Sequence, residues 1–239
     1  MTKEELSALA ERARQIRGSI IRMLASAGSG HPGGSLSVAD LLALLYFRRM
    51  RIDPKNPRWP DRDRFVLSKG HAAPVLYATL AEAGFFPKEA LTTLRQFGSI
   101  LQGHPDMKRT PGVEMSTGSL GQGFSAANGM ALAGRLDRKD YRVYTLIGDG
   151  ESEEGEIWEA AMTAVHYKLD NLTAFLDYNH LQIDGTIEDV KSNLNLPGKF
   201  AAFGWHVIEV ENGHDVAAID RAIDEAVATK GKPTMIILH

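Results

Sequence analysis

Apolar residues recur at helical spacing in the first part of the chain. Thr2 and Glu5 form a capping-box pattern, and leucine, alanine and isoleucine then repeat every three or four positions up to Gly28. This pattern predicts a first helix that ends there. The largely apolar residues 37–46 predict a second helix, and the proline-containing residues 53–61 predict an irregular loop.

From residue 64 onward, short apolar runs alternate with stretches of helical spacing. The runs have the length of buried strands and lie at residues 64–67, 143–147, 172–176, 206–210 and 234–238. Helices are predicted between them, at residues 125–136, 157–167 and 216–228. Strands that alternate with helices predict an α/β fold with a mostly parallel sheet flanked by helices. No repeat or linker-like segment divides residues 1–239, so we expect a single domain.

The loops that follow the predicted strands hold the unusual residues. Ligands of parallel α/β sheets bind beyond the carboxyl ends of the strands, so we expect chemistry in these loops. Residues 98–120 form the longest stretch without a repeating pattern. Loops of that length in compact domains are usually functional or disordered, and this one contains Gly103-His104-Pro105 and the start of a glycine-rich string at residues 116–123.

Composition narrows the classes of function. The 239 residues are 44% hydrophobic and 24% charged, which is enough for a sizeable core. A formal net charge of -3 disfavours binding to nucleic acid, and the lack of cysteine excludes disulfides, thiolate metal sites and a cysteine nucleophile. The N-terminus lacks a signal-peptide pattern, and no apolar run approaches the length of a membrane span. We therefore expect a cytoplasmic protein that binds neither nucleic acid nor membranes.

The sharpest chemical signal is Gly148-Asp149-Gly150-Glu151, which follows the apolar run at residues 143–147 and precedes a helical stretch. Asp149 is thus expected at the carboxyl end of a strand. Glycines let the backbone approach a phosphate closely, the helix start offers free N–H groups, and a carboxylate can bind a hard cation. An isolated Gly-Asp-Gly string is more often an ordinary turn, so this motif alone does not decide the function.

The next predicted strand, at residues 172–176, is followed by Asn179. This asparagine is therefore expected at the carboxyl end of an adjacent strand. Magnesium binds about six oxygens and keeps substrate phosphates among them. Asp149, the Asn179 amide, a backbone carbonyl and two diphosphate oxygens would supply such a shell. Without the first motif, Asn179 would be read as a turn residue.

The string Gly148-Asp149-Gly150, followed thirty positions after its aspartate by Asn179, resembles the thiamine-diphosphate fingerprint of transketolases, phosphoketolases and 2-oxo acid dehydrogenases. The resemblance implies that Asp149, Asn179 and the Leu181 carbonyl bind the metal, which would be Mg²⁺ or another divalent cation such as Ca²⁺ or Mn²⁺. It also implies that the Gly150 N–H contacts the diphosphate of the cofactor, thiamine diphosphate. The implied fold is the diphosphate-binding half of these enzymes.

Three strings that each contain a histidine resemble loops of transketolases within that superfamily. They are Ser29-Gly30-His31-Pro32-Gly33-Gly34-Ser35, Leu67-Ser68-Lys69-Gly70-His71 and Gly103-His104-Pro105. Deoxyxylulose-phosphate synthase has a related layout but lacks the His-Pro-Gly-Gly string in its first loop, and it remains the alternative enzyme. The resemblance runs from about residue 10 to the last predicted strand.

The resemblance implies catalytic roles for three histidines. His31 and His104 would contact the hydroxyls and the carbonyl-derived oxygen of the sugar donor, and His71 would also approach the cofactor diphosphate. Histidine suits these tasks because its unperturbed pKa of about 6.5 lets it donate and accept protons near neutral pH. A single histidine in a glycine- and proline-rich loop is more often a solvated surface residue, so only the combination supports these roles. The surface interpretation is kept for His166, His180, His206 and His214.

The glycine-rich string at residues 116–123 resembles the family's loop whose backbone holds the aminopyrimidine ring of the cofactor. Gly118 and Leu120 are the matching contacts. From the residues alone, the same string could be a helix N-terminus capped by Thr117 or Ser119.

An acidic run at the start of the next helix has two interpretations. Glu151, Glu153, Glu154 and Glu156 would ordinarily form a solvated first turn that favours the helix dipole. By resemblance, Glu154 and Glu159 match glutamates that lie between subunits and join the cofactor sites through an acidic network.

A complete transketolase continues into a pyrimidine-binding domain and a C-terminal domain, which this sequence does not contain. The resemblance therefore implies the N-terminal subunit of a split transketolase, with residues 1–239 as one thiamine-diphosphate- and Mg²⁺-binding domain. Such a subunit would transfer a two-carbon ketol unit between sugar phosphates of the pentose phosphate pathway. It would act with a complementary C-terminal subunit, two copies of each chain forming the complex. The alternatives are a non-catalytic cofactor-binding module and an ordinary α/β domain with coincidental motifs.

Overall fold

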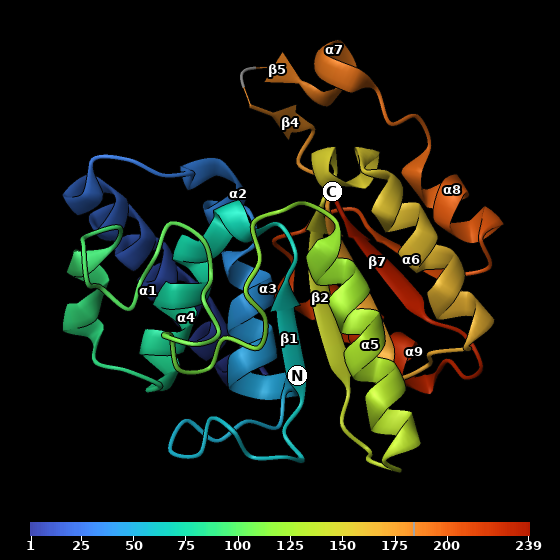
Figure 1. Cartoon of the computed structure of the whole chain (residues 1–239), viewed down its shortest axis with the longest axis horizontal. Coiled ribbons are helices and arrows are strands. Elements are labelled where there is room, and N and C mark those ends of the chain that lie inside the picture. The colour runs from blue at the N-terminus through green and yellow to red at the C-terminus, as the bar shows by residue number, and fades with distance from the viewer. Residues whose placement is uncertain (184) are drawn as a thin grey trace.

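The computed structural model describes residues 1–183 and 185–239, and its centre is a five-stranded parallel sheet. From edge to edge the strands are β1 (Arg64–Leu67), β2 (Val143–Gly148), β3 (Leu172–Asp177), β7 (Thr234–Leu238) and β6 (His206–Val210). A separate antiparallel hairpin, β4 (Leu181–Gln182) and β5 (Gly185–Thr186), projects beyond the carboxyl edge of this sheet (Figure 1). The predicted α/β fold with a parallel sheet is confirmed.

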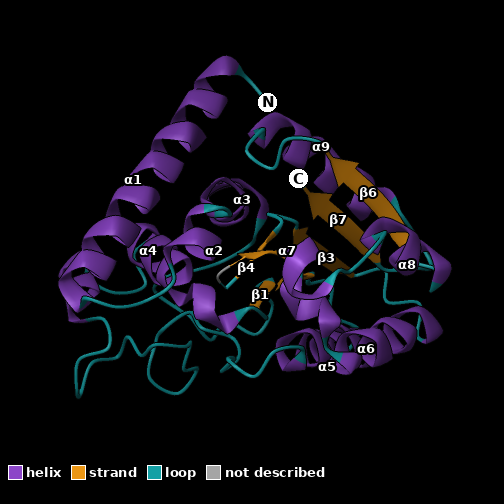
Figure 2. Ribbon diagram, turned by 90° about the horizontal axis from the view of Figure 1, so that it is seen from above, coloured by secondary structure: helices purple, strands orange, loops and turns teal. Residues whose placement is uncertain are grey.

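Helices cover both faces of the sheet (Figure 2). One face is covered by α1 (Lys3–Ala27), α3 (Ala39–Leu44), α4 (Ala73–Ala83) and α9 (Val216–Ala228). The other is covered by α5 (Gln122–Leu136), α6 (Gly155–His166) and α8 (Leu196–Ala202). Two shorter helices, α2 (Pro32–Leu36) and α7 (Ile187–Lys191), lie toward the carboxyl edge of the sheet.

The strands read as continuous apolar runs because both of their faces are buried. Side chains alternate between the two faces along each strand. In β7, Ile236 packs in the cluster on the α1 side, and Met235 and Ile237 pack in the cluster on the α5 side. The sheet is therefore the common wall of two hydrophobic cores, and its carboxyl edge is free to carry polar loops.

Most of the predicted elements are present. All five apolar runs form strands, and α9 has the predicted bounds. The capping box also forms: the Thr2 hydroxyl accepts from the Glu5 N–H at 3.2 Å, and the Glu5 carboxylate accepts from the Thr2 N–H at 2.7 Å. Gly28 ends the first helix with a φ of 64°. The irregular loop at residues 53–61 contains no helix or strand.

Helices α5 and α6 begin three and two residues earlier than predicted, and α6 ends one residue earlier. Two predictions nearer the N-terminus need a larger correction. The second helix is shorter than the predicted residues 37–46, because α3 covers Ala39–Leu44 and continues as a π-helical turn at Leu45–Arg49. The His-Pro-Gly-Gly string was expected to be a loop, but it forms the short helix α2, which Pro32 can start because a helix needs no N–H donor at its first position.

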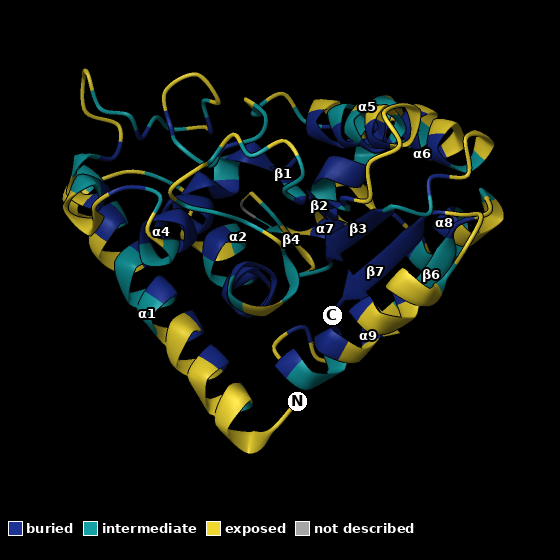
Figure 3. Ribbon diagram, turned by 90° about the horizontal axis from the view of Figure 1, so that it is seen from below, coloured by how far each residue is buried: buried dark blue, intermediate teal, exposed yellow. Residues whose placement is uncertain are grey.

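All six residues of the apolar helix α3 are buried, and the helix lies between α1 and the sheet in Figure 2. Figure 3 shows the same view from the opposite side, with the buried interior in dark blue. This position explains why its residues are apolar all round rather than on one face. Within the described residues, no helix combines the length and the apolar surface needed to cross a bilayer.

Candidate functional site

Asp149 lies where β2 ends, at the start of a 3₁₀ turn formed by Gly150–Glu153. One carboxylate oxygen accepts from the Gly150 N–H and the other from the His180 N–H, each at 2.8 Å. Asp149 is only 3% exposed, and its burial raises the pKa of the carboxyl to about 6. A carboxylate with so little water around it is well placed to gain from a bound cation.

The turn that contains Asn179 follows β3, the neighbour of β2 in the sheet. The Asn179 amide donates to the Asp177 carboxylate at 2.9 Å, and its oxygen accepts from the Leu181 N–H at 2.9 Å. Because His180 donates to Asp149, this turn and the Asp149 turn are in direct contact.

The expected metal ligands fit a hard cation by their chemistry. The carboxylate of Asp149, the amide oxygen of Asn179 and the backbone carbonyl of Leu181 are all oxygen donors, which Mg²⁺ and Ca²⁺ prefer. Within the described residues, no group of three His, Cys, Asp or Glu side chains could hold a metal alone. The set therefore suits a cation whose shell is completed by oxygens of a bound ligand, such as a diphosphate.

A buried ion pair lies next to these turns. Asp177, the last residue of β3, pairs with the ammonium group of Lys69, which also donates to the Gly34 carbonyl at 2.9 Å. The Ser37 hydroxyl donates to the other Asp177 oxygen at 2.6 Å. The pair ties the end of β3 to the turn after β1 and to α2. The sequence interpretation gave Lys69 no role, because its charge partner lies far away in the sequence.

The three expected histidines form one cluster. His31 precedes α2, His71 lies in a 3₁₀ turn at Gly70–Ala72, and the ring centroids of these two histidines are 5.5 Å apart. Burial and the positive charge of Lys69 lower the pKa of His71 to about 4, and His31 and His104 add to this effect. Burial also lowers the pKa of His104, and the nearby His31 and Arg95 lower it further. The rings of His71 and His104 are thus neutral at pH 7, and each can donate one hydrogen bond and accept another.

The glycine-rich string packs against two of the histidine loops. A Cβ atom on Gly118 would lie 3.1 Å from the His104 ring, and one on Gly70 would lie 2.7 Å from the Gly118 nitrogen. Only glycine permits this close approach of backbone segments. The Thr117 hydroxyl donates to the Leu67 carbonyl at 2.7 Å and thereby fixes the string beside the end of β1. Leu120, the other expected contact of the pyrimidine, is half-buried.

The alternative interpretation of this string, a helix N-terminus capped by Thr117 or Ser119, is right about the helix start and wrong about the cap. Helix α5 begins at Gln122 after Gly121, which has no side chain to act as a cap. The Phe124 N–H in its first turn donates instead to the Ser68 hydroxyl at 3.0 Å. Thr117 instead bonds to Leu67, so its hydroxyl serves the packing of the loop.

The prediction that the acidic run is solvated is wrong for Glu151, which is only 2% exposed. Its carboxylate accepts from the Ser68 hydroxyl at 2.6 Å, from the Gly121 N–H at 2.8 Å and from the Gly148 N–H at 3.1 Å. Burial raises the pKa of this carboxyl, although the three donors oppose that shift. Glu151 therefore joins a histidine loop, the start of α5 and the end of β2. No local pattern signals this role, because its partners are distant in the sequence.

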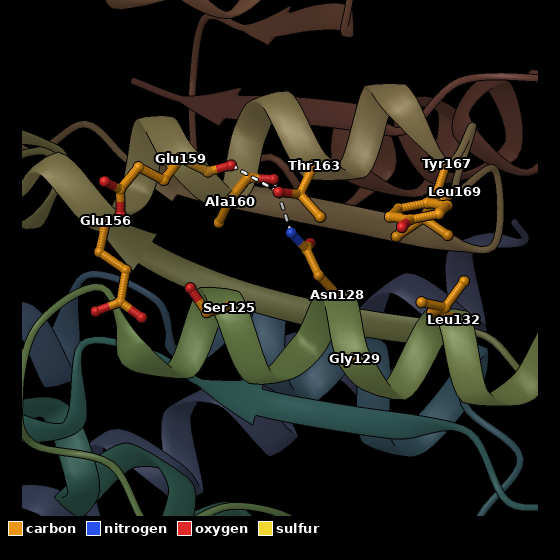
Figure 4. A pocket seen from close by; sticks show the side chains of 10 residues that line it. All are labelled: Ser125, Asn128, Gly129, Leu132, Glu156, Glu159, Ala160, Thr163, Tyr167 and Leu169. Atoms are coloured by element: carbon orange, nitrogen blue, oxygen red, sulfur yellow. Dashed lines mark hydrogen bonds between the residues drawn. The ribbon is translucent and has the colours of Figure 1, made fainter.

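Glu154 and Glu159 are exposed on this chain. Glu154 lies beside the glycine-rich string, since a Cβ on Gly121 would be 3.6 Å from the Glu154 Cβ. Glu159 lines a groove of about 370 Å³ between α5 and α6, together with Asn128 and Thr163 (Figure 4). The two glutamates therefore belong to different parts of the surface, one at the start of α6 and one along it.

The four remaining histidines considered have varied surroundings. His206 contacts Glu225 at 2.8 Å, His214 contacts Asp40 at 2.9 Å, and the His166 ring packs on Tyr167. His180 differs from these because its backbone N–H binds Asp149, while its side chain is half exposed. The sequence interpretation of His180 as a plain surface residue missed this backbone contact.

Comparisons with known proteins agree on one family. The model described as "Transketolase, thiamine diphosphate binding domain" matches residues 9–239. A 6-deoxy-6-sulfo-D-fructose transketolase subunit of a Clostridium species is 52% identical over 239 residues, covering 100% of this chain and 86% of the relative. An apulose-4-phosphate transketolase subunit of Phocaeicola vulgatus is 46% identical, covering 92% of this chain and 78% of the relative.

Solved structures give the same result. The transketolase from Leishmania mexicana superimposes with a TM-score of 0.92 at 38% identity. The match covers 96% of this chain and 36% of the Leishmania chain, so this chain corresponds to about a third of that protein. The chain therefore belongs to the transketolase family, and residues 9–239 match its thiamine-diphosphate-binding domain.

Proposed function

We propose that this chain binds thiamine diphosphate and Mg²⁺ as the N-terminal component of a transketolase. With a complementary chain it would transfer a two-carbon ketol unit from a ketose phosphate to an aldose phosphate. The observation that carries the proposal is the buried carboxylate of Asp149, which contacts the Asn179 turn at the same sheet edge where the three histidine loops lie. Residues 1–239 would act as one domain in this assembly.

The metal and the diphosphate would be held by the turns after β2 and β3. Asp149, the Asn179 amide oxygen and the Leu181 carbonyl are the proposed Mg²⁺ ligands. The Gly150 N–H, which now donates to Asp149, is the proposed contact of the diphosphate. The lack of a side chain at Gly150 supports this, since even a Cβ there would lie 3.3 Å from the Gln182 side chain. A side chain at this position would therefore crowd the Gln182 side chain.

The glycine-rich string and the glutamates are proposed to serve the other end of the cofactor. The backbone at Gly118 and Leu120 would contact the aminopyrimidine ring. Glu154 and Glu159 are exposed here and would lie against a second chain in the complex, where they would link the cofactor sites.

When bound, thiamine diphosphate supplies a carbon nucleophile and an electron sink for cleavage of the ketose. His31 and His104 are proposed to bind the donor hydroxyls and the oxygen derived from the carbonyl. Since the pKa of His104 is lowered by burial, its neutral ring can hold a proton on one nitrogen and accept one on the other. His71, with a pKa of about 4, would approach the diphosphate without adding a positive charge at pH 7.

The proposed partner is a complementary C-terminal transketolase chain, with two copies of each chain in the complex. Two relatives that are named as transketolase subunits match this chain over most of their own length, and this supports the proposal. Those relatives are named for 6-deoxy-6-sulfo-D-fructose and for apulose-4-phosphate. Their names support a phosphorylated or otherwise anionic sugar as the substrate class. A cytoplasmic location and a place in the pentose phosphate pathway remain part of the proposal.

Calorimetry followed by an activity assay tests the proposed function. Thiamine diphosphate is titrated into the chain with Mg²⁺, first alone and then with the complementary chain, and ketose-to-aldose transfer is measured for each mixture. We expect binding that requires Mg²⁺ and turnover only with the complementary chain. Binding without turnover in any pairing would identify a cofactor-binding module instead. Pyruvate consumption in place of ketose consumption would indicate a deoxyxylulose-phosphate synthase.

A further inference from the structure

Residues 180–183 and 185–193, which contain β4, β5 and α7 and are here called the arm, rise from the carboxyl edge of the sheet (Figure 1). Both ends of the arm are attached to Asp149. At its start, the His180 N–H donates to the Asp149 carboxylate at 2.8 Å. At its end, the Asn193 amide donates to the Asp149 backbone carbonyl at 3.0 Å. Asp149 therefore binds the start of the arm through its side chain and the end of the arm through its backbone carbonyl.

Asn193 points inward although its neighbours in the chain do not. It is 8% exposed, while Ser192 and Leu194 on either side are exposed. Its amide nitrogen also lies 3.0 Å from the hydroxyl of Ser152, which itself donates to the Asp149 carbonyl. A buried amide that donates to two acceptors is fixed in its orientation, because each lost bond would leave a polar atom without water.

The hydrogen bond from Asn193 to the Asp149 carbonyl also fixes the orientation of the neighbouring Gly150 N–H. The Asp149 carbonyl and the Gly150 N–H belong to one planar peptide unit, so a donor that fixes the oxygen also fixes the direction of the N–H. This N–H donates to the Asp149 carboxylate at 2.8 Å. Asn193 thus fixes the carbonyl end of the peptide between residues 149 and 150. The N–H at the other end of the same peptide orients the Asp149 carboxylate.

We propose that Asn193 is a positioning residue for the metal site. It contacts no proposed ligand atom, but it fixes the peptide that orients the Asp149 carboxylate and it closes the arm on that residue. This inference rests on the proposed function, since it takes Asp149 as a ligand of Mg²⁺. Partners that orient metal ligands typically change metal affinity by about 10- to 100-fold when they are removed. Coupling between two processes is reciprocal, so Mg²⁺ binding would in turn hold the arm closed.

Two asparagines in the same stretch give a matched pair of variants. Asn193→Asp keeps the shape of the side chain but removes both donated bonds and places a negative charge beside the Asp149 carbonyl. Asn195→Asp makes the same chemical change two positions later, where the side-chain oxygen accepts from the Gly198 N–H at 3.0 Å and can still do so. Asn193→Ala is a third variant that removes the donor without adding charge.

The first measurement is a calorimetric titration of Mg²⁺ into each full-length chain at saturating thiamine diphosphate. We expect the dissociation constant for Mg²⁺ to rise about 10-fold or more in both Asn193 variants and to stay within about twofold of the parent in Asn195→Asp. Hydrogen exchange supplies the second readout. Mg²⁺ should slow exchange in the arm of the parent and of Asn195→Asp, and it should have little effect on the arm of the Asn193 variants.

The possible failures are distinguishable. Equal Mg²⁺ affinities in Asn193→Ala, Asn195→Asp and the parent would overturn the role of Asn193 and leave the metal site intact. A parent chain that binds no Mg²⁺ at all would overturn the proposed function and this inference with it. If Asn193→Asp does not fold, as judged by circular dichroism, Asn193→Ala decides between these outcomes by the same titration.

Discussion

The ammonium group of Lys69 donates a hydrogen bond to the carboxylate of Asp177, and both side chains are almost completely buried. This pair connects the turn after β1 with the end of β3, and the Ser37 hydroxyl adds a bond from the α2 side. Charges so far from water remain stable only while each has its partner. The pair is therefore one of the contacts that fix the His71 loop and α2 against the end of β3.

Lys69→Met removes the positive charge and keeps most of the side-chain volume. We expect the free energy of unfolding, measured with denaturant, to fall by about 3–5 kcal/mol, because Asp177 is left as an unpaired buried charge. The control is Lys139→Met, since Lys139 and Asp61 pair at the surface with 40% and 41% of their side chains exposed. That variant should stay within about 0.5 kcal/mol of the parent. Similar losses in the two variants would contradict a special role for the buried pair.

The stability of the metal-free protein should depend on the charge of Asp149. The folded pKa of about 6 lies above the usual value of 3.8, so the folded protein holds this proton more tightly than the unfolded chain. The carboxyl therefore costs no stability below about pH 4 and opposes folding increasingly as the pH rises to about 6. The cost at pH 7 is up to about 3 kcal/mol.

Asp149→Asn removes this titration and keeps the shape of the side chain, but its amide nitrogen cannot accept from one of the two N–H donors, which lowers stability by a pH-independent amount. Relative to the parent, the metal-free variant should gain stability between about pH 4 and pH 7, as measured by urea unfolding at several pH values. Saturating Mg²⁺ and thiamine diphosphate should stabilise the parent more than the variant, because only the parent keeps the charged ligand. A difference between the two proteins that stays constant with pH would show that the carboxyl is not perturbed by burial.

His71 should remain neutral in mildly acidic solution. Its pKa of about 4 lies below the unfolded value of about 6.5, so the folded protein binds fewer protons in this range. Stability is thus lost as the pH falls from about 6.5 to about 4. Nuclear magnetic resonance of the histidine ring nitrogens should give a midpoint near the lower value for this residue. In His71→Gln the loss of stability over the same range should be smaller, and a midpoint near 6.5 in the parent would contradict the prediction.

Glu151→Gln tests the three bonds that this carboxylate accepts. The amide oxygen could still accept from Ser68 and Gly121. The amide nitrogen, itself a donor, would then face the Gly148 N–H, which would lose its acceptor. We expect the free energy of unfolding to fall by about 1–3 kcal/mol, because a buried donor is left without an acceptor. Glu211→Gln is the control on an exposed residue and should change it by less than about 0.5 kcal/mol. No difference between the two variants would mean that water replaces the lost bond.

The sheet and its polar edge could be predicted because they depend on local patterns and one general rule. Five apolar runs identified the strands, and the parallel arrangement placed Asp149 and Asn179 at neighbouring strand ends. The backbone contact between His180 and Asp149 is a direct result of that arrangement. The convergence of His31, His71 and His104 followed from the family resemblance, since nothing in the spacing of three distant loops determines that they meet.

The parts that could not be predicted depend on contacts between distant residues. Glu151 looks like any glutamate near a helix start, and its burial is set by Ser68 and Gly121 from other loops. Asn193 lies in a polar stretch where an inward side chain has no sequence signal. The helix at Pro32–Leu36 is too short to show a hydrophobic period, and its glycines argue against a helix.

The order of the strands in the sheet also affects folding of the chain during its synthesis. The strand β7, from Thr234–Leu238, lies between β3 and β6, although both of these precede it in the chain. The ribosome therefore synthesises this inner strand after both of its neighbours, and β6 cannot join the sheet through it until residues 234–238 have been made. Until then, the turns after β2 and β3 rest on an open half-sheet with an exposed edge. During that interval the unpaired edge of β3 is a surface on which chains can aggregate, and the strand that covers it is the last one made.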